Sequence, residues 1–399
     1  MKTNARGRRR WFLVAGGVLA TLIAAVVGVY VWAWASTDDS TIARAMIWRE
    51  SDVGDQHRFP ARRISAGGHT SPLVRGVEAN LALSGERENF DQFLDDTDTL
   101  AFVVVHQDKL VYERYFGDST RESLQTSFSV AKSFASTLVG IAIDEGLIGS
   151  VDDRITKYVP ELARRDPRFR QITLRHLLTM SSGIRYREGG GFPWPFGDDT
   201  YTYYGVDLRE IALHRTKIEQ PPGLAWLYNN YNPLLLGLVL ERATGVSVSD
   251  FMATRLWQPL GAEADATWSL DSKPSGFEKM ESGVNARAVD YTRFGLLFLH
   301  QGDWNGRRIV SKKWVRAATG AEGATGAIDQ AYYHGYRYFW WIDVNRPGSF
   351  YAMGKYGQYV YVAPDADTVV VRLGRDWGVN NVAWLAIFRD VADQLEHGP

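Results

Sequence analysis

The chain has 399 residues, of which 45% are apolar and 23% are charged, a composition typical of a globular protein with one large core or two closely packed units. The formal net charge of −1 gives no basic surface of the kind that nucleic-acid-binding proteins need, so no nucleic-acid partner is expected. The absence of cysteine excludes disulfides, thiolate metal sites and lipid attached to cysteine.

The first 35 residues have the pattern of a membrane anchor. Residues 1–10 form a basic flank without acidic residues, and residues 11–35 carry no charge. An uncharged run of this length can cross a bilayer as a helix, with the basic flank in the cytoplasm. We therefore expect a single-pass protein of the inner (cytoplasmic) membrane whose folded part lies in the periplasm. Ala33-Trp34-Ala35 also fits a signal-peptidase site, so a cleaved export signal stays open as an alternative.

The segment after the apolar run predicts an arm followed by a folded domain. Residues 36–90 are polar and irregular, as in a juxtamembrane arm, and the folded domain is expected to occupy residues 91–399. Two apolar, β-branched runs, 100–106 and 110–116, flank the turn at 107–109 and predict a hairpin.

The middle of the chain is predominantly helical by its apolar spacing. The helices expected there span residues 132–145, 174–180, 234–243, 250–257 and 291–300. Residues 189–204 are rich in glycine, proline and aromatic residues and predict one long loop. The aromatic residues of this loop fit equally well a lid over a site and ordinary packing.

The C-terminal part of the chain returns to strands. Residues 359–363 and 368–373 predict a second hairpin around 364–367, and residues 381–396 predict an amphipathic helix. Strands at both ends with helices between them indicate an α/β (α+β) fold. We expect an antiparallel sheet flanked by helices, with a mostly helical subdomain inserted at about residues 118–275.

Ser129 and Lys132 form a Ser-x-x-Lys pair where the predicted helix 132–145 begins. One helical turn separates the two residues, so the lysine amine is expected near the serine hydroxyl. A serine hydroxyl becomes a good nucleophile only when a neighbouring base takes its proton, and a lysine in a suitable environment can do so. The N–H groups at the helix N-terminus favour negative charge that develops there. The pattern predicts a nucleophile, although chance alone also supplies one such pair in a chain of this length.

Tyr228 and Asn230, in the segment Tyr228-Asn229-Asn230, are the second pair of candidates. A tyrosine beside a serine–lysine pair can shuttle protons, because nearby ammonium charge favours the phenolate. An asparagine two residues further on offers a donor and an acceptor to a substrate amide. A surface turn with a packed tyrosine is the alternative interpretation of this segment alone.

Lys355, Gly357 and Gln358 are the third group of candidates, directly before the strand predicted at 359–363. A glycine at the start of a strand lets a substrate backbone approach closely. The Gln358 N–H is then a second donor of an oxyanion hole, opposite the Ser129 N–H. An ordinary glycine-containing turn is the alternative. A phosphate-binding loop is excluded because Ser349 stands where that motif needs its first glycine.

Metal and cofactor chemistry have no sequence support. The chain contains neither His-Glu-x-x-His nor Gly-x-Ser-x-Gly, which excludes the common zinc hydrolase and α/β-hydrolase patterns. His176 and His300 lie in helical segments and are expected to be structural. We therefore expect no metal and no cofactor.

Taken together and in this order, the three segments resemble the signature of the penicillin-recognising serine hydrolases, which include class C β-lactamases, D,D-peptidases and related esterases. The flanking runs 177–183, 230–245 and 290–306 are similar to the same group, and the resemblance covers roughly residues 95–390. Within that group the chain looks most like the 6-aminohexanoate-dimer hydrolases, whose third segment also departs from Lys-Thr-Gly.

The resemblance implies a β-lactamase/transpeptidase-like fold and a role for each candidate. Ser129 matches the acylated nucleophile, Lys132 its base partner, and Tyr228 the proton shuttle that also serves the leaving group. Asn230 matches the substrate-contacting asparagine of the second segment.

The third segment of the resemblance departs from the usual pattern, because Lys355-Tyr356-Gly357 has a tyrosine in place of threonine. That threonine normally helps to hold the carboxylate of a β-lactam or peptide. The departure favours a hydrolase of small linear amides or esters that works through an acyl-enzyme on Ser129. Two alternatives stay open: a penicillin-binding D,D-peptidase or β-lactamase, and a non-catalytic ligand-binding protein on the same fold.

Overall fold

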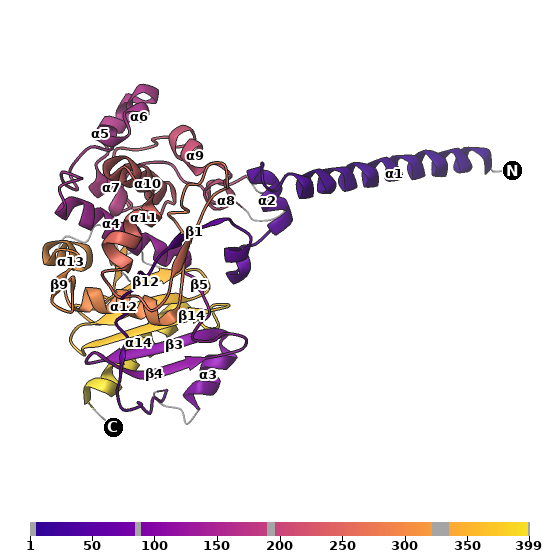
Figure 1. Ribbon diagram of the computed structural model, residues 1–399. Helices are drawn as coiled ribbons and strands as arrows, with labels where there is room; N and C mark the ends of the chain where they lie inside the picture. The colour runs from indigo at the N-terminus through magenta and orange to yellow at the C-terminus, as the bar shows by residue number, and fades with distance from the viewer. Residues whose placement is uncertain (1–4, 84–88, 190–195, 321–334, 398–399) are drawn as a thin grey trace. The chain divides into compact units, whose positions relative to one another are not determined.

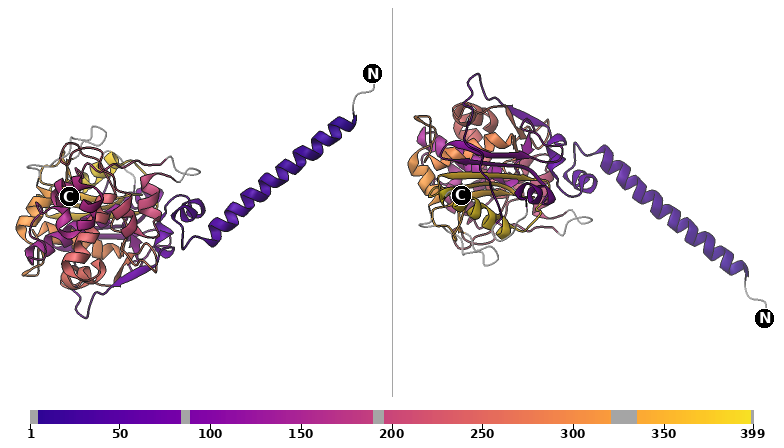
Figure 2. Two further views of the ribbon diagram at one scale, coloured as in Figure 1. Left: turned by 90° about the horizontal axis from the view of Figure 1, so that it is seen from above. Right: turned by 90° about the horizontal axis from the view of Figure 1, so that it is seen from below.

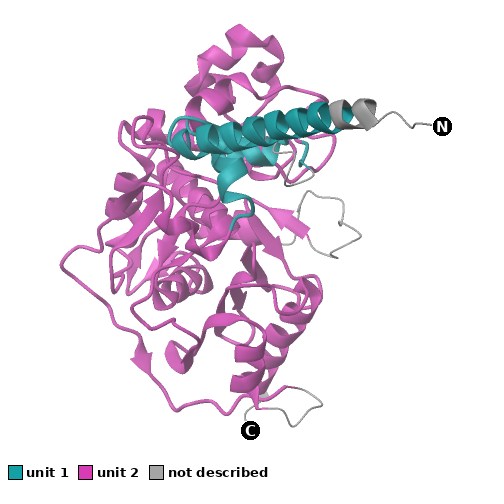
Figure 3. Cartoon of the chain, turned by 90° about the vertical axis from the view of Figure 1, so that its right-hand side faces the viewer, with its two compact units in different colours: residues 1–51, 187–206 teal, residues 52–186, 207–399 magenta. Residues whose placement is uncertain are grey.

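The computed structural model describes residues 5–83, 89–189, 196–320 and 335–397 (Figure 1). The chain divides into two compact units, one of residues 1–51 with 187–206 and one of residues 52–186 with 207–399 (Figure 3). The first unit contains α1 (Ala5–Ala35), α2 (Thr41–Trp48) and α8 (Asp198–Tyr204). The helices of the second unit are α3 (Phe90–Asp96), α4 (Ala131–Asp144), α5 (Ile155–Tyr158), α6 (Pro160–Arg165), α7 (Leu174–Leu178), α9 (Leu208–His214), α10 (Tyr231–Thr244), α11 (Val248–Met252), α12 (Ala288–Leu299), α13 (Lys312–Thr319) and α14 (Asn381–His397).

The long helix α1 contains the uncharged run of the sequence. Trp11–Ala35 is apolar and long enough to cross a membrane, and it lies near the N-terminus, as a signal sequence also does. Its large apolar side chains are exposed along the whole run. The expected apolar helix is therefore confirmed, and its use as an anchor is treated below as a proposal.

The two chain segments of the first unit are joined by hydrogen bonds. The buried Arg44 of α2 donates to the carbonyls of Thr37 (2.6 Å) and Gly205 (3.2 Å). The Tyr204 hydroxyl donates to the Arg49 carbonyl at 2.7 Å. Two acidic residues in the first turn of α8 suit the positive end of a helix. The prediction of one long loop over 189–204 is therefore wrong for residues 198–204, while 190–195 lie outside the described residues.

An eight-stranded sheet forms the base of the second unit, in the order β10-β11-β12-β13-β14-β3-β4-β2. Its strands are β2 (Val74–Arg75), β3 (Thr99–His106), β4 (Lys109–Tyr115), β10 (Gly335–Arg337), β11 (Trp340–Ile342), β12 (Phe350–Gly354), β13 (Gln358–Ala363) and β14 (Thr368–Gly374). Both predicted hairpins are confirmed as β3–β4 and β13–β14. They are joined side by side through antiparallel pairing of β14 with β3, so the two ends of the domain build one sheet.

Helices cover both faces of this sheet (Figures 1 and 2). Gly295 of α12 lies against Val360 and Val369, with space for no Cβ. Phe388 of α14 packs against Tyr359, and the side chains of neighbouring strand residues point to opposite faces. Helix α4, which carries Lys132, lies beyond α12, because the rings of Phe134 and Phe294 stack at 3.8 Å.

A second, four-stranded sheet has the order β1-β6-β7-β5 and was not predicted. Its strands are β1 (Ala61–Ile64), β5 (Gln125–Thr126), β6 (Ala266–Ser269) and β7 (Val284–Ala286). Because β1 pairs with β6 and β2 pairs with β4, the region 36–90 is less irregular than expected. A small hairpin, β8 (Asp303–Trp304) with β9 (Arg307–Arg308), follows α12.

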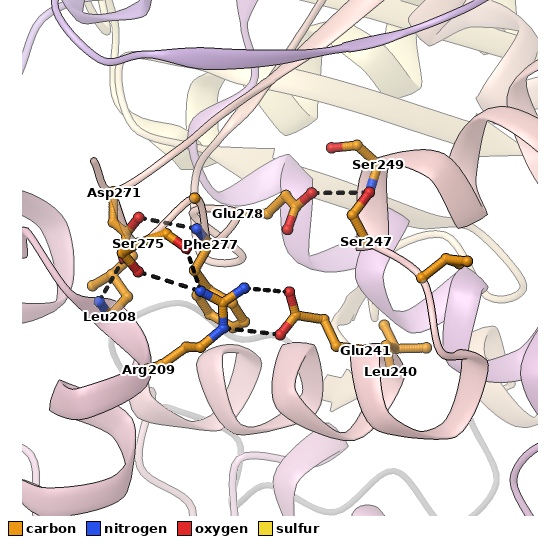
Figure 4. A network of polar contacts seen from close by, with 12 residues as sticks. Leu208, Arg209, Leu240, Glu241, Ser247, Ser249, Asp271, Ser275, Phe277 and Glu278 are labelled. Carbon is orange, nitrogen blue, oxygen red and sulfur yellow. Dashed lines mark hydrogen bonds and ion pairs between the residues drawn. The ribbon is translucent and has the colours of Figure 1, made fainter. Parts of the chain in front are cut away.

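A polar network ties the helical region to the segment that leads into β7 (Figure 4). Arg209 of α9 donates to the Glu241 carboxylate of α10 and to the Ser275 carbonyl. The buried Asp271 accepts from the backbone N–H groups of Leu208 and Phe277. These contacts fix the residues just before 279–286, which take part in the site described below.

The buried Asp290 of α12 gives the fold a testable pH dependence. Burial raises its pKa from 3.8 to about 6, the nearby Arg293 opposing this shift. Between these two values the Asp290 carboxyl is more protonated in the folded protein than in the unfolded chain, so its contribution to the free energy of unfolding falls by up to about 3 kcal/mol as the pH rises from 4 to 6. We expect Asp290→Asn to flatten this slope in urea denaturation curves. An unchanged slope would show that the carboxyl is already ionised at pH 4.

Candidate active site

The candidate nucleophile lies on a tight turn between β5 and α4. The Ser127 N–H donates to the Val284 carbonyl at 2.8 Å, which fixes the start of the turn on β7. Phe128 follows with a φ of 42°, a conformation that is costly for a residue other than glycine. Phe128–Val130 form one 3₁₀ turn before α4 begins at Ala131. This geometry places Ser129 at the N-terminus of the helix, as the sequence predicts.

Lys132 is brought to the serine hydroxyl. Its Nζ lies 2.8 Å from Ser129 Oγ and 3.0 Å from the carbonyl oxygen of Glu281. The side chain is only 1% exposed, and among the described residues no carboxylate lies within ion-pair distance of Nζ. A buried amine without a counter-charge, held against a hydroxyl, is the arrangement that a base for that hydroxyl requires.

Tyr228 completes this group from the loop before α10. Its ring lies 4.8 Å from Lys132 Nζ, which places an aromatic face beside the amine. Three further aromatic rings surround it: Trp226, Tyr336 and Trp341, with ring centroids 6.0–6.3 Å from that of Tyr228. Burial raises the pKa of Tyr336 well above its usual range, so this neighbour stays a neutral phenol. The cluster limits the access of water to Tyr228.

Asn230 presents an unused acceptor. Its Nδ2 donates to the Tyr186 hydroxyl at 2.9 Å, while its Oδ1 is buried and has no hydrogen-bond partner among the described residues. The neighbouring Asn229 instead has structural contacts, because its Nδ2 donates to Ile184 O and its Oδ1 accepts from Tyr231 N–H. A buried acceptor without a hydrogen bond lowers the stability of the fold unless a ligand donates a hydrogen bond to it.

The third segment lies at the site through Gly354, a residue that the sequence did not single out. A Cβ on Gly354 would overlap with the carbonyl oxygen of Ser127 and lie 3.0 Å from the Ser129 nitrogen. The end of β12 therefore runs directly along the turn that carries Ser129, the candidate nucleophile turn Ser127–Val130. The atoms nearest to a Cβ on Gly357 belong to Arg372 and Tyr359, so this side of Gly357 faces the buried Arg372 side chain.

Lys355 and Gln358 flank the turn between β12 and β13. Gln358 pairs with Gly354 in the hairpin, and its side-chain amide donates to the carbonyls of Lys355 (3.1 Å) and Gly374 (2.7 Å). The Lys355 Nζ lies 4.8 Å from the Tyr356 ring centroid. The side chain of Gln358 thus stabilises the turn. The role predicted for Gln358, as a second donor of an oxyanion hole, concerns its backbone N–H.

Two contributors to the site were missed because they leave weak sequence signals. The Glu281 carbonyl is a backbone group, which any residue at that position supplies. Gly354 was visible only as a second glycine in Gly354-Lys355-Tyr356-Gly357, and spacing alone does not say which of the two lies against the turn that carries Ser129.

Of the histidines expected to be structural, His176 lies 3.2 Å from the Thr173 hydroxyl and His300 is 2.7 Å from an Asp108 carboxylate oxygen. The described residues contain no cluster of His, Cys, Asp and Glu that could hold a metal ion.

The fold defines a class: it is the mixed α/β fold of β-lactamases and transpeptidases, with helices on an antiparallel sheet. The Beta-lactamase family model matches residues 87–384. The 6-aminohexanoate-dimer hydrolase of Paenarthrobacter ureafaciens is 30% identical over 355 residues, covering 82% of this chain and 84% of that protein. Penicillin-binding protein 4 of Amycolatopsis lactamdurans is 26% identical, covering 69% of this chain and 78% of its own.

A solved structure titled "Putative 6-aminohexanoate-dimer hydrolase from Bacillus anthracis" superposes with a TM-score of 0.78 at 25% identity, over 87% of this chain and 94% of that one. The chain therefore belongs to the β-lactamase family, and its relatives there include a 6-aminohexanoate-dimer hydrolase. The predicted resemblance and the predicted β-lactamase/transpeptidase-like α/β fold are confirmed, while the crossing of a membrane by α1 and the bounds of the helical insertion stay predictions.

Proposed function

We propose that the protein is a serine hydrolase that cleaves small linear amides or esters through an acyl-enzyme on Ser129. The observation that carries the proposal is the 2.8 Å contact between Ser129 Oγ and the buried amine of Lys132. The Tyr228 ring beside that amine supplies the third member. The relationship to a 6-aminohexanoate-dimer hydrolase supports the same reaction class.

In the proposed acylation step, Ser129 Oγ attacks the substrate carbonyl carbon while its proton passes to the Lys132 amine. The oxyanion accepts hydrogen bonds from the Ser129 N–H and from an N–H of the turn Lys355–Gln358, which follows Gly354. The tetrahedral intermediate then expels an amine or alcohol, which takes a proton through Tyr228. A water molecule then attacks the carbonyl carbon of the ester on Ser129 by the same steps, which releases the acid product and restores the serine hydroxyl.

Asn230 and Lys355 are the proposed substrate-binding side chains. The unpaired Oδ1 of Asn230 suits the N–H of a substrate amide, which an ester lacks. We therefore expect amides to gain more from Asn230 than esters do. Lys355 is proposed to attract an anionic group of the substrate. No cofactor takes part in the proposed reaction.

A penicillin-binding D,D-peptidase or β-lactamase is the second candidate. It is favoured by the penicillin-binding relative and by the proposed location, in which α1 anchors the catalytic domain on the periplasmic side of the inner membrane. It is disfavoured by the third segment, where Met353 and Ala352 precede Gly354 and Tyr356 follows it, so no threonine is present to hold a carboxylate.

The test of the proposed function is intact-mass spectrometry of the full chain in detergent after reaction with a fluorophosphonate. We expect one covalent adduct on the wild-type protein and none on Ser129→Ala. Fluorescent penicillin and a panel of esters and linear amides follow on the same samples. An equal adduct on both proteins would contradict the proposal, and saturable binding without turnover would leave a ligand-binding protein on the same fold.

A further inference from the structure

Arg372 of β14 is a fully buried arginine whose hydrogen bonds all go to uncharged groups. Its exposed fraction is 0%, and among the described residues no carboxylate lies within ion-pair distance of its guanidinium. Trp384 of α14 covers one face of the guanidinium at 3.9 Å from the ring centroid. A buried cation without a counter-ion is costly, so its retention needs an explanation from the groups that it binds.

The donors of Arg372 connect two parts of the chain. On one side Nε donates to the Thr99 hydroxyl (3.0 Å) and Nη2 to the Thr97 carbonyl (2.7 Å), which fixes the guanidinium on the start of β3. On the other side Nη1 donates to the carbonyls of Gly357 (2.9 Å) and Tyr356 (3.3 Å). These two carbonyls belong to the turn between β12 and β13.

The Arg372 guanidinium packs directly against the turn Lys355–Gln358 and restricts which residues can stand there. A Cβ on Gly357 or on Gly374 would overlap with Arg372 Nη1, so each position has room only for glycine. The φ of 62° at Tyr356 is also unfavourable for a residue other than glycine. Charge-assisted hydrogen bonds to both turn carbonyls are strong enough to hold such a conformation.

The same turn also contacts the residues around Ser129. The Tyr356 ring packs edge-on against Phe128 at 5.4 Å between centroids, and Phe128 directly precedes Ser129. Gly354, at the end of β12, lies against the backbone of Ser127 and Ser129. Arg372 therefore acts on the turn that carries Ser129 only indirectly: it binds the carbonyls of the Lys355–Gln358 turn, and the Tyr356 side chain of that turn contacts Phe128.

We propose that Arg372 is a positioning residue that holds the Lys355–Gln358 turn at its working distance from Ser129. The inference rests on the proposed function, in which this turn supplies the second oxyanion donor. Oxyanion contacts strengthen in the transition state, so a displaced turn lowers kcat and leaves KM unchanged. A shift of the donor by about 1 Å costs about a hundredfold in rate.

The test compares Arg372→Lys with Arg293→Lys in the full chain. Arg293 is equally buried, and it donates to Asp290, Glu263 and the Ser71 carbonyl, none of which belongs to the site. Lysine keeps the charge in both variants but cannot reach several acceptors at once. We expect both variants to lose thermal stability, and only Arg372→Lys to lose about a hundredfold in kcat on an ester and in the rate of fluorophosphonate labelling, with KM unchanged.

Thr99→Val is the milder second variant if Arg372→Lys does not fold. It removes only the hydroxyl that orients Nε, and we expect a fall in kcat of about five- to tenfold at constant KM, one hydrogen bond being weakened. Wild-type labelling that is absent on Ser129→Ala shows that the proposed function holds, whatever the variants do. Equal kcat losses in Arg372→Lys and Arg293→Lys, or wild-type rates in Arg372→Lys or Thr99→Val, would overturn the positioning role alone.

Discussion

Replacing Lys132 by methionine is expected to reduce kcat by about a thousandfold to ten-thousandfold, because the only base within reach of Ser129 Oγ among the described residues is removed. Methionine fills a similar volume, so KM should change little. Because the amine is buried without a carboxylate partner, the variant is expected to be at least as stable as the wild type. Steady-state kinetics on an ester and thermal denaturation of the same sample measure both effects.

Lys132→Arg is the matched control for this prediction. Arginine places a permanent positive charge beside Tyr228 and stays protonated, so it cannot accept the serine proton. If Lys132 acts as the base, both variants are inactive. Substantial activity in Lys132→Arg would mean that the lysine contributes only its charge, and the proposed proton transfer would then need another acceptor.

Gly354→Ala is expected to lower kcat by about a hundredfold to a thousandfold, since the added methyl group must displace the nucleophile turn. A Cβ there would overlap with Ser127 O and lie 3.1 Å from the Phe128 Cβ. The φ of Gly354 does not lie in the left-handed region, so alanine is not excluded by its backbone conformation. Any loss therefore comes from the close approach of β12 to the turn.

Gly68→Ala is the control for Gly354→Ala. Gly68 has no atom within 4 Å of a Cβ, and its φ is also outside the left-handed region. We expect wild-type kinetics from this variant, measured as kcat and as the rate of fluorophosphonate labelling. Wild-type kinetics in Gly354→Ala as well would show that the nucleophile turn tolerates displacement, and would argue against a donor from the neighbouring turn.

Elements with a strong local pattern were predicted well. The hairpins β3–β4 and β13–β14 and the helices α4, α10, α12 and α14 differ from their predicted ranges by a few residues. In each case the apolar period and a turn or capping residue lie within the segment itself. The segment 189–204 is rich in glycine, proline and aromatic residues and so predicts a loop, yet at 198–204 contacts with α2 and its C-cap Arg49 stabilise a helix. Those contacts come from residues about 160 positions earlier, which no local pattern contains.

The candidate site divides in the same way. Ser129 and Lys132 are one helical turn apart, so their contact follows from sequence spacing once the helix is known. The placement of Tyr228 beside Lys132 depended on a resemblance to a family and not on spacing. The roles of Lys355, Gly357 and Gln358 stay predictions.

The amino-acid sequence alone predicts the serine–lysine pair, the two hairpins, the apolar N-terminal helix and the order of the three segments. Each is encoded by residues a few positions apart, whose geometry the helical or strand period fixes. Three contacts could be seen only in the folded chain: Gly354 lies against the turn that carries Ser129, the Glu281 carbonyl accepts from Lys132, and Arg372 binds the third segment. The first two contacts join residues up to 227 positions apart, and all three depend on strand pairing and close packing, which leave no periodic signal in the chain.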